Sequence, residues 1–342
     1  MFSTDVVLIG AGPIGIELAV ALKRAGLDYV HLEARQIGHT MTWWAPGTRW
    51  FSSNDRISIA GVPLHTLDHG KATREEYLRY LRSIVEQFDL SIRTYEPVTA
   101  VRADDGEFLV HTATRTHPHT YRARRVILAT GGTARPRRLD IPGAELSHVS
   151  HFMHEPHLYF RQRVLVVGGK NSAVESALRL HHAGARVGLS YRGAELPAKT
   201  IKYWLYPEIA GLIKARVITP YFSTVPTQIT ASAVTLHSHA TREDIEVPAD
   251  FVLLQIGYVA DMTLARMGGV ELREPAETPA FDPKTMETNV KGLYVAGTAI
   301  AGSQDRFAVF LENCHVHVGR IVAALTGRDP PREVKSLLPS EV

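Results

Sequence analysis

The chain has 342 residues, of which 45% are hydrophobic, and its 38 basic and 35 acidic side chains leave a formal net charge of +3. This length exceeds the ~250 to 300 residues at which a single core usually divides, so two domains are expected. The basic residues are scattered, which argues against nucleic acid as a partner. Because no run approaches the ~20 apolar residues that span a bilayer, and no secretory leader precedes the first strand, a cytoplasmic protein without membrane contact is expected.

A dinucleotide-binding motif opens the chain. An apolar strand that begins at Val6 runs into the sequence Gly-Ala-Gly-Pro-Ile-Gly at 10–15, and a helix is predicted over 16–25. The first glycine permits a tight turn, the second leaves room for a pyrophosphate, and the third lets the helix pack closely on the strand. A second strand over 29–32 ends in a carboxylate that is placed to accept hydrogen bonds from an adenosine ribose. The residues predicted to bind this nucleotide are Gly10, Gly12, Pro13, Gly15 and Glu33.

A second copy of the motif follows a strand over 163–167 and reads Gly-Gly-Lys-Asn-Ser-Ala at 168–173. Its second strand, over 185–191, ends without a carboxylate and is followed by basic residues. Because the guanidinium fork of arginine suits a 2′-phosphate, the pattern favours NADPH over NADH. The residues predicted for this site are Gly168, Lys170, Asn171, Ser172, Ala173, Arg192, Lys199, Lys202 and Gly257.

Lys170 stands where the middle glycine of the second motif is expected. Its Cβ would crowd the approach of a pyrophosphate, yet its ammonium could pair with a phosphate directly. Two interpretations therefore stay open: an intact NADPH site, or a degenerate, purely structural second domain.

Each motif is followed by a strand-rich stretch and an apolar strand that ends in glycine, at 126–131 and 252–257. Asp105 and Gly106 predict a hairpin turn between strands at 99–102 and 107–110. A third glycine-ended strand at 292–297 and a helix over 307–325 complete the chain, and the simplest assembly returns them to the first domain. The expected fold class is α/β with two nested Rossmann-like domains: 1–136 plus 258–342, and 137–257.

This order of elements resembles the flavoprotein disulfide reductases in their short, thioredoxin-reductase-like form. The resemblance implies that the first domain binds FAD and the second binds NADPH. Thr298 stands where thioredoxin reductases have an aspartate that contacts the flavin, and its hydroxyl can still form a hydrogen bond. The further FAD-binding residues that the resemblance implies are Trp50, Ser52, Val101, Ala129, Thr130, Gly131, Gly297, Thr298 and Phe307.

Thioredoxin reductases carry a Cys-x-x-Cys before the second motif, whereas the only cysteine here is Cys314. One cysteine cannot form a dithiol couple, and its setting in a helical pattern favours a buried, inert thiol over a flavin-adjacent nucleophile. With its 168–173 motif, Tyr191-Arg192-Gly193 and the 155–157 loop, the chain looks most like the YpdA-type bacillithiol disulfide reductases. That family implies NADPH-driven reduction of an oxidised low-molecular-weight thiol through FAD.

One departure from the family concerns Ile14, which occupies a position where members often have a cysteine. Isoleucine has no redox chemistry, so either the reduced flavin reacts with its acceptor directly or the acceptor is not a disulfide. The same two-domain frame also serves ferredoxin reductases, quinone reductases and flavin monooxygenases, which stay open as alternatives. A non-enzymatic alternative also stays open, in which Lys170 has ended NADPH binding and the chain is a flavin-loaded redox sensor or interaction module. A small redox protein as partner and a homo-oligomer such as a dimer also stay open.

Four histidines recur at every third position from 148 to 157. Zinc sites usually have two pairs of ligands that lie farther apart in sequence than these histidines do. No metal is therefore expected, and a polar loop is the favoured interpretation. His151 and His154 are weak candidates for proton donors beside the flavin, by analogy with general acids. The aromatic residues Trp43, Trp44, Trp50 and Phe51 could cover the isoalloxazine ring or belong to the domain core.

Overall fold

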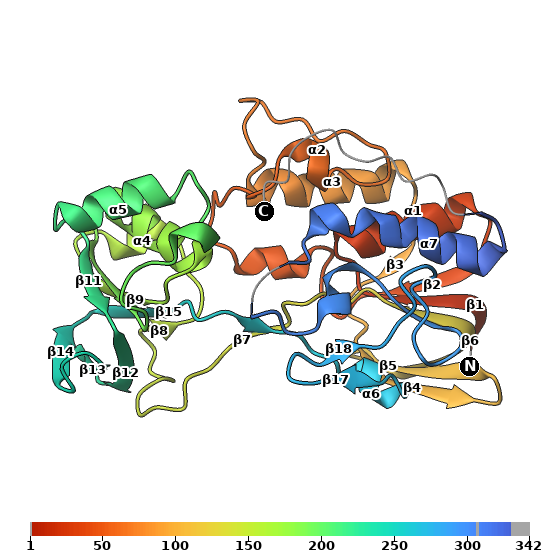
Figure 1. Ribbon diagram of the computed structural model, residues 1–342. Coiled ribbons are helices and arrows are strands. Elements are labelled where there is room, and N and C mark those ends of the chain that lie inside the picture. Colours follow the sequence, from red (N-terminus) through yellow and green to blue (C-terminus); the bar gives the residue numbers. More distant parts are fainter. Residues whose placement is uncertain (1, 306–307, 330–342) are drawn as a thin grey trace. The chain divides into compact units, whose positions relative to one another are not determined.

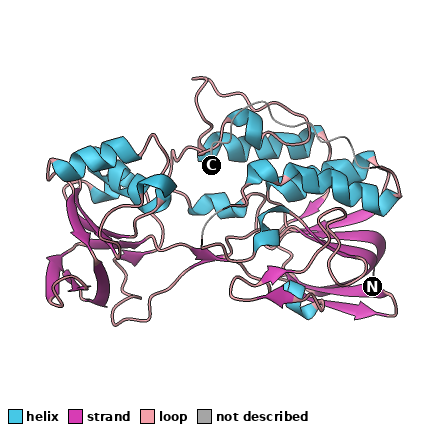
Figure 2. Cartoon of the chain, viewed as in Figure 1, coloured by secondary structure: helices cyan, strands magenta, loops and turns pink. Residues whose placement is uncertain are grey.

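The computed structural model describes residues 2–305 and 308–329, and the chain divides into two compact units. Within these residues, unit 1 comprises 2–42, 47–135 and 258–329, and unit 2 comprises 43–46 and 136–257. Both units combine helices with parallel strands, as Figures 1 and 2 show. The expected α/β class with Rossmann-like domains is confirmed. No helix in the described ranges is both long and apolar enough to cross a membrane.

Unit 1 is built on a seven-stranded sheet in the order β3-β2-β1-β6-β5-β4, with β19 also paired to β6. The strands β3, β2, β1, β6 and β19 are parallel, whereas β4, β5 and β6 form an antiparallel meander. The length of β6 allows both pairings, because residues 118–123 pair with β5 and residues 126–128 pair with β19. The carboxyl ends of β1, β6 and β19 therefore meet at one edge of the sheet. The bounds are β1 (Phe2–Ile9), β2 (Tyr29–Leu32), β3 (Ile92–Arg93), β4 (Val98–Asp104), β5 (Glu107–Ala113), β6 (Pro118–Leu128) and β19 (Leu293–Val295).

Three longer helices of unit 1 lie on one face of this sheet, with α1 in contact with both α3 and α7 (Figure 1). The sequence sets the ends of α1, because a proline fits the first turn and two basic residues favour the last turn. The start of α3 is fixed by a capping box between Thr73 and Glu76. The helices are α1 (Pro13–Arg24), α2 (Asn54–Ile57), α3 (Arg74–Gln87), α6 (Thr263–Met267) and α7 (His315–Thr326), with 3₁₀ turns η1 (His39–Trp43), η4 (Gly297–Ala301) and η5 (Leu311–Asn313).

Unit 2 contains a five-stranded parallel sheet in the order β11-β10-β9-β15-β8 and a separate antiparallel meander β12-β13-β14. Side chains of β9 alternate between the two faces: Val164 and Val166 pack with residues of α4, and Leu165 and Val167 pack with residues of the meander. This alternation follows from the period of two of a β-strand. The elements are β8 (Val149–Ser150), η2 (Pro156–Tyr159), β9 (Arg163–Val167), α4 (Asn171–His182), β10 (Arg186–Tyr191), η3 (Ala198–Thr200), α5 (Tyr206–Lys214), β11 (Thr219–Phe222), β12 (Thr224–Ile229), β13 (Ala233–Ser238), β14 (Asp244–Pro248) and β15 (Phe251–Leu254).

Four short strands complete the list: β7 (Arg135–Pro136) pairs with β16 (Tyr258–Val259), and β17 (Leu272–Arg273) pairs with β18 (Thr278–Pro279). The predicted hairpin between β4 and β5 is confirmed. Its turn residues Asp105 and Gly106 have φ of 47° and 80°, the left-handed pair that a tight hairpin requires.

The predicted helix bounds need two corrections. Helix α1 begins at Pro13, three residues before the expected start. Helix α7 begins only at His315, so a helix over 307–325 is wrong at its start. The Asn313 side chain accepts a hydrogen bond from Phe310 N and donates one to Ala308 O. These side-chain bonds take backbone groups that a helix would use, and the segment folds as a turn and η5 instead.

Candidate functional site

The glycine loop of unit 1 joins β1 to α1. Gly10 has a φ of +105°, and a Cβ there would lie 2.5 Å from the carbonyl oxygen of Ala129. A Cβ on Gly15 would lie 1.9 Å from the carbonyl oxygen of Gly10. A Cβ on Gly12, the N-cap of α1, would meet no atom within 4 Å. The fold therefore requires Gly10 and Gly15, whereas Gly12 leaves open space at a helix N-terminus, where backbone N–H groups favour anions.

Glu33 follows β2 and its carboxylate lies against this loop. Its Oε2 accepts a hydrogen bond of 2.7 Å from Ala11 N, and its Oε1 accepts one of 2.8 Å from Arg35 N. A carboxylate has about four lone-pair sites, so two bonds leave capacity for the hydroxyls of a ribose. The predicted acid thus lies beside the predicted loop.

His31 is a member of this site that the sequence analysis missed. Its Nε2 lies 2.9 Å from the carbonyl oxygen of Gly10. Burial lowers the pKa of His31 to about 4, so the ring is neutral at pH 7 and Nε2–H donates to that carbonyl. The sequence feature that could have identified it is a histidine in an otherwise apolar strand.

Two further segments meet the glycine loop at the same edge of the sheet. Ala129 N donates to Ile9 O at 2.8 Å, and Ala296 N donates to Leu128 O at 2.9 Å. Gly132 N donates to the Thr298 hydroxyl at 2.9 Å, which joins the segments after β6 and β19. The structure thereby brings together the predicted residues Ala129, Thr130, Gly131, Gly297 and Thr298.

A second missed residue, His317 of α7, holds the last of these segments. Gly297 N donates to its Nδ1 at 3.1 Å. Burial lowers the pKa of His317 to about 4, which keeps Nδ1 available as an acceptor. A Cβ on Gly297 would lie 3.5 Å from the Cβ of Ile14, so the buried Ile14 side chain borders this segment.

Other residues predicted to bind FAD lie elsewhere in unit 1. Trp50 packs on Tyr77 of α3, with ring centroids 4.5 Å apart. Val101 is fully buried in the core beside β5, and Ser52 lies in the loop before α2. Phe307 falls outside the described residues. The roles of these residues toward a flavin stay predictions.

The glycine loop of unit 2 repeats the geometry of the first. Gly168 has a φ of +143°, and its N–H donates to Ser190 O at 2.9 Å, as Gly10 N donates to Leu32 O at 2.8 Å. The residue that corresponds to Glu33 is therefore Tyr191, and Arg192 lies one residue beyond the position assumed from the sequence. A Cβ on Gly169 would lie 2.3 Å from the Tyr191 ring, which covers the loop.

Lys170 is the N-cap of α4, as Gly12 is of α1. Its φ of −106° lies in the extended region, so the lysine is accommodated without backbone strain. Lys170, Ser172, Arg192 and Lys199 are exposed, whereas Ala173 is buried against the sheet. Gly257 has a φ of +100° and lies just after β15.

The histidine loop belongs to unit 2. His154 is exposed, and its Nε2 lies 3.2 Å from the Ser150 hydroxyl. Burial lowers the pKa of His151 below its usual range. Among the residues that the structure describes, no group of three or more His, Cys, Asp or Glu side chains is arranged to hold a metal ion. The Trp43 ring packs on Phe152 of this loop at 5.3 Å.

Cys314 is fully buried at the N-cap of α7, one residue before the helix. Its Sγ donates to Phe310 O at 3.0 Å. Burial raises the pKa of the thiol to about 12, so it stays protonated at neutral pH and is a poor nucleophile.

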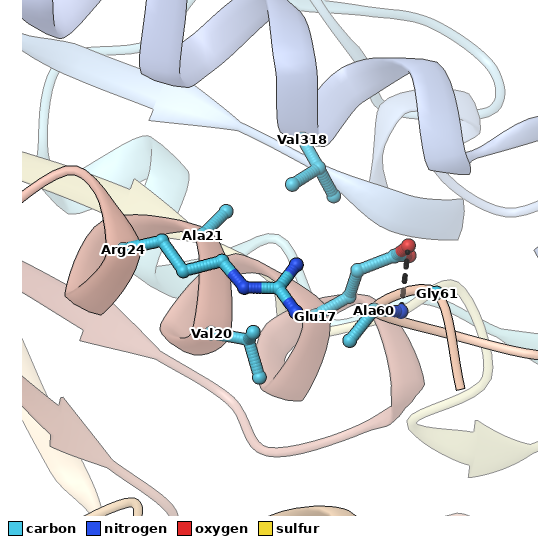
Figure 3. Close-up of a pocket in the computed structure, with 7 residues that line it drawn as sticks. All are labelled: Glu17, Val20, Ala21, Arg24, Ala60, Gly61 and Val318. Carbon is cyan, nitrogen blue, oxygen red and sulfur yellow. Dashed lines mark hydrogen bonds between the residues drawn. The ribbon is translucent and has the colours of Figure 1, made fainter. Parts of the chain in front are cut away.

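A small pocket of about 260 Å³ lies beside α1, lined by Glu17, Val20, Ala21, Arg24, Ala60, Gly61 and Val318 (Figure 3). Glu17 accepts from Ala60 N at 3.1 Å, and its second oxygen lies 2.7 Å from Nδ1 of His315. Burial lowers the pKa of His315, but the hydrogen bond and charge of Glu17 outweigh it and raise the pKa. No residue predicted to bind a cofactor lines this pocket.

Two units that each place a glycine loop between a parallel strand and a helix define an α/β protein with two Rossmann-like domains of the dinucleotide-binding type. Residues 7–297 match the model of the pyridine nucleotide-disulphide oxidoreductase family, and the chain belongs to that family.

The similarity to curated and solved proteins extends over nearly the whole chain. Bacilliredoxin reductase Bdr of Bacillus subtilis (strain 168) is 33% identical over 330 residues, which cover 96% of this chain and 99% of that protein. The solved structure of Bacillithiol Disulfide Reductase Bdr (YpdA) from Bacillus cereus matches with a TM-score of 0.90 and 31% identity over 96% of this chain and 100% of its own. A Ferredoxin--NADP reductase of Ignicoccus hospitalis is 25% identical over 300 residues, 86% of this chain and 89% of that protein.

These relatives confirm the resemblance to the YpdA-type reductases. The chain is a flavoprotein oxidoreductase, and its cofactors are FAD and NADPH.

Proposed function

We propose that this enzyme uses NADPH to reduce the disulfide of a low-molecular-weight thiol, such as bacillithiol disulfide. The observation that carries the proposal is the match over 96% of the chain to a structure titled Bacillithiol Disulfide Reductase. In the overall reaction, the hydride of NADPH and one proton from solvent break one S–S bond, and two thiols and NADP⁺ are formed.

FAD is assigned to unit 1. The geometry that supports this assignment is the open space at Gly12, the N-cap of α1. A Cβ added to Gly12 would meet no protein atom within 4 Å. In the proposed site, backbone N–H groups of α1 bind the pyrophosphate and Glu33 accepts from the ribose. Bound FAD supplies hydride acceptance and two-electron transfer. The segments at 129–131 and 297–298 would hold its remaining part at the edge of the sheet.

NADPH is assigned to unit 2, where the N-terminus of α4 repeats the geometry of α1. Lys170 would pair with the pyrophosphate, and Arg192, Lys199 and Lys202 would bind the 2′-phosphate. Tyr191 stands at the position that the ribose-binding acid has in unit 1. Unit 2 therefore has no carboxylate at this position that would repel the 2′-phosphate. The domain assignment follows: 1–136 plus 258–342 for FAD, and 137–257 for NADPH.

The acceptor disulfide is proposed to react without help from a protein thiol. Ile14 has no redox chemistry, and the Cys314 thiol is buried and protonated. Cys314→Ala should therefore retain the turnover number of the unmodified enzyme within about twofold, measured as thiol release with NADPH. A loss of turnover at unchanged FAD content and thermal stability would instead make Cys314 a participant. His151 and His154 remain candidates for the proton donor.

The first experiment is an anaerobic titration of the FAD-loaded enzyme with NADPH and, separately, with NADH. We expect NADPH to bleach the oxidised flavin band rapidly, and bacillithiol disulfide then to restore it with the release of two thiols per NADPH. A flavin band that persists with NADPH would refute the nucleotide assignment. Rapid bleaching without reoxidation by the disulfide would refute the acceptor but leave the reductase half-reaction.

Ferredoxin reduction is a second candidate, favoured by the 25% identity to a Ferredoxin--NADP reductase. Ferredoxin would dock through complementary charge, so its reduction should weaken steeply with salt because exposed charges are screened. Reduction of bacillithiol disulfide should change much less. Turnover with each acceptor at increasing ionic strength separates the two.

A small redox protein is also proposed as a partner, because the relative from B. subtilis is named a bacilliredoxin reductase. A cytoplasmic setting suits an enzyme that keeps thiols reduced.

A homo-oligomer, with a dimer as its simplest form, stays a prediction that light scattering of the FAD-loaded protein would test.

A further inference from the structure

Asn171 is the first residue of α4, and its side chain joins this helix to a later segment of unit 2. Its Nδ2 donates to Thr200 O at 3.2 Å, and its Oδ1 accepts from Lys202 N at 2.8 Å. The two partners fix the orientation of the amide, because a carbonyl oxygen can only accept and a backbone N–H can only donate. One side chain thereby ties the backbone of residues 200–202 to the start of the helix.

The segment so held carries the two lysines that were predicted to bind a phosphate. Lys199 lies in η3, directly before Thr200, and Lys202 is itself bonded through its backbone N–H. The carbonyl oxygen of Lys202 also accepts from Leu205 N at 2.9 Å and Tyr206 N at 3.2 Å, where α5 begins. The backbone of Lys202 is thus bonded on both sides, by α4 through Asn171 and by the start of α5.

This segment lies next to the glycine loop of unit 2. Asn171 directly follows Lys170, the N-cap of α4, and Gly168 N donates to Ser190 O of β10 at 2.9 Å. Arg192 comes two residues after Ser190, so it emerges at the same edge of the sheet. Basic residues from two separate segments therefore border one helix N-terminus, and Asn171 determines where one of these segments lies.

We propose that Asn171 is a positioning residue that sets the preference for NADPH over NADH by holding the segment of Lys199 and Lys202 beside the N-terminus of α4. The proposal rests on the assignment of NADPH to unit 2. In it, Asn171 acts through the lysines, which contact the 2′-phosphate, and its amide does not contact the nucleotide. NADH lacks that phosphate, so its binding gains little from the segment.

The variant Asn171→Ala removes both hydrogen bonds. Asn171→Asp keeps the acceptor for Lys202 N but sets a carboxylate oxygen against Thr200 O, where no donor remains. The matched control is Asn289→Ala in unit 1, because Asn289 also accepts from a backbone N–H, of Glu271 at 2.9 Å, and donates to a carbonyl, of Gly269 at 3.1 Å. The control measures the effect of losing a similar loop contact away from unit 2.

The test is calorimetric binding of 2′,5′-ADP and 5′-AMP, which differ only in the 2′-phosphate, to the FAD-loaded protein, followed by KM and kcat with NADPH and NADH. Wild-type protein should bind 2′,5′-ADP more tightly than 5′-AMP. Asn171→Ala should weaken 2′,5′-ADP binding and raise the KM for NADPH about tenfold, while 5′-AMP binding, the KM for NADH and kcat change less than about twofold. Asn171→Asp should lower the preference further, and Asn289→Ala should leave it unchanged.

Equal weakening of both ligands by Asn171→Ala, or no weakening of either, would overturn the inference. It would also fall if wild-type protein bound 2′,5′-ADP no better than 5′-AMP. If 2′,5′-ADP binding depends on Asn171 as stated but NADPH does not bleach the flavin, the proposed function fails while the positioning role stands. The two failures are thereby distinguishable.

Discussion

The backbone N–H of Gly297 donates to Nδ1 of His317, which joins the segment after β19 to helix α7. His317→Ala should leave that buried N–H without a partner, at a cost of about 1–3 kcal/mol. We expect the affinity for FAD to fall about 5- to 100-fold, measured by fluorescence titration of the deflavinated protein. In His317→Asn the amide Oδ1 can replace Nδ1, so this variant should recover most of the affinity. Equal losses in both variants would mean that the ring is needed for packing alone.

Gly12 and Gly15 provide a comparison between a glycine required by a ligand and one required by the fold. Gly12→Ala should fold with unchanged thermal stability, because its Cβ meets no protein atom, but should bind FAD at least tenfold more weakly. Gly15→Ala should lower the melting temperature of the deflavinated protein as well, because its Cβ would lie 1.9 Å from Gly10 O. Normal FAD binding by Gly12→Ala would contradict the assigned pyrophosphate position.

Lys170 separates the reductase from the sensor interpretation. If its ammonium pairs with the pyrophosphate, Lys170→Ala should raise the KM for NADPH and for NADH by similar factors, about tenfold, since both share that group. Stopped-flow measurement of the rate of flavin reduction, at increasing concentrations of NADPH and of NADH in turn, checks both factors. In the sensor interpretation, wild-type protein would not be reduced, and Lys170→Gly would create nucleotide reduction.

Glu175 of α4 should make stability depend on pH. Burial raises its pKa to about 7, and the nearby charge of Arg179 only partly opposes this. A carboxyl whose pKa is raised by folding binds more protons in the folded than in the unfolded state between pH 4.5 and 7. Its contribution to stability is therefore favourable at low pH and is lost as pH rises through this range.

Glu175→Gln removes this titration. The difference in unfolding free energy between variant and wild type should shift in favour of the variant by on the order of 2 kcal/mol from pH 4.5 to pH 8. Urea denaturation at a series of pH values measures it. Parallel pH profiles for the two proteins would show that the carboxyl titrates normally.

The sequence by itself determined the local elements. The spacing of Gly10, Gly12 and Gly15 after an apolar strand specifies a turn and a helix, because backbone conformation and close approach depend on the missing Cβ atoms. The turn at Asp105 and Gly106 is equally local, and both residues adopt the expected left-handed conformation. The single cysteine of this sequence, Cys314, cannot form an intramolecular dithiol couple in any fold.

Only the tertiary structure decided which distant residues support these elements. His31 and His317 bond the backbone at Gly10 and Gly297, and no local pattern specifies such partners because they depend on the pairing of strands and the packing of α7. The register of β10 against the second loop puts Tyr191, and not Arg192, at the position in unit 2 that corresponds to Glu33 in unit 1. The bonds from Asn171 to residues 200–202 likewise form only when α4 and the later segment pack together. Local conformation follows from neighbours in the chain, whereas hydrogen-bond partners far apart in sequence are fixed by the packed fold.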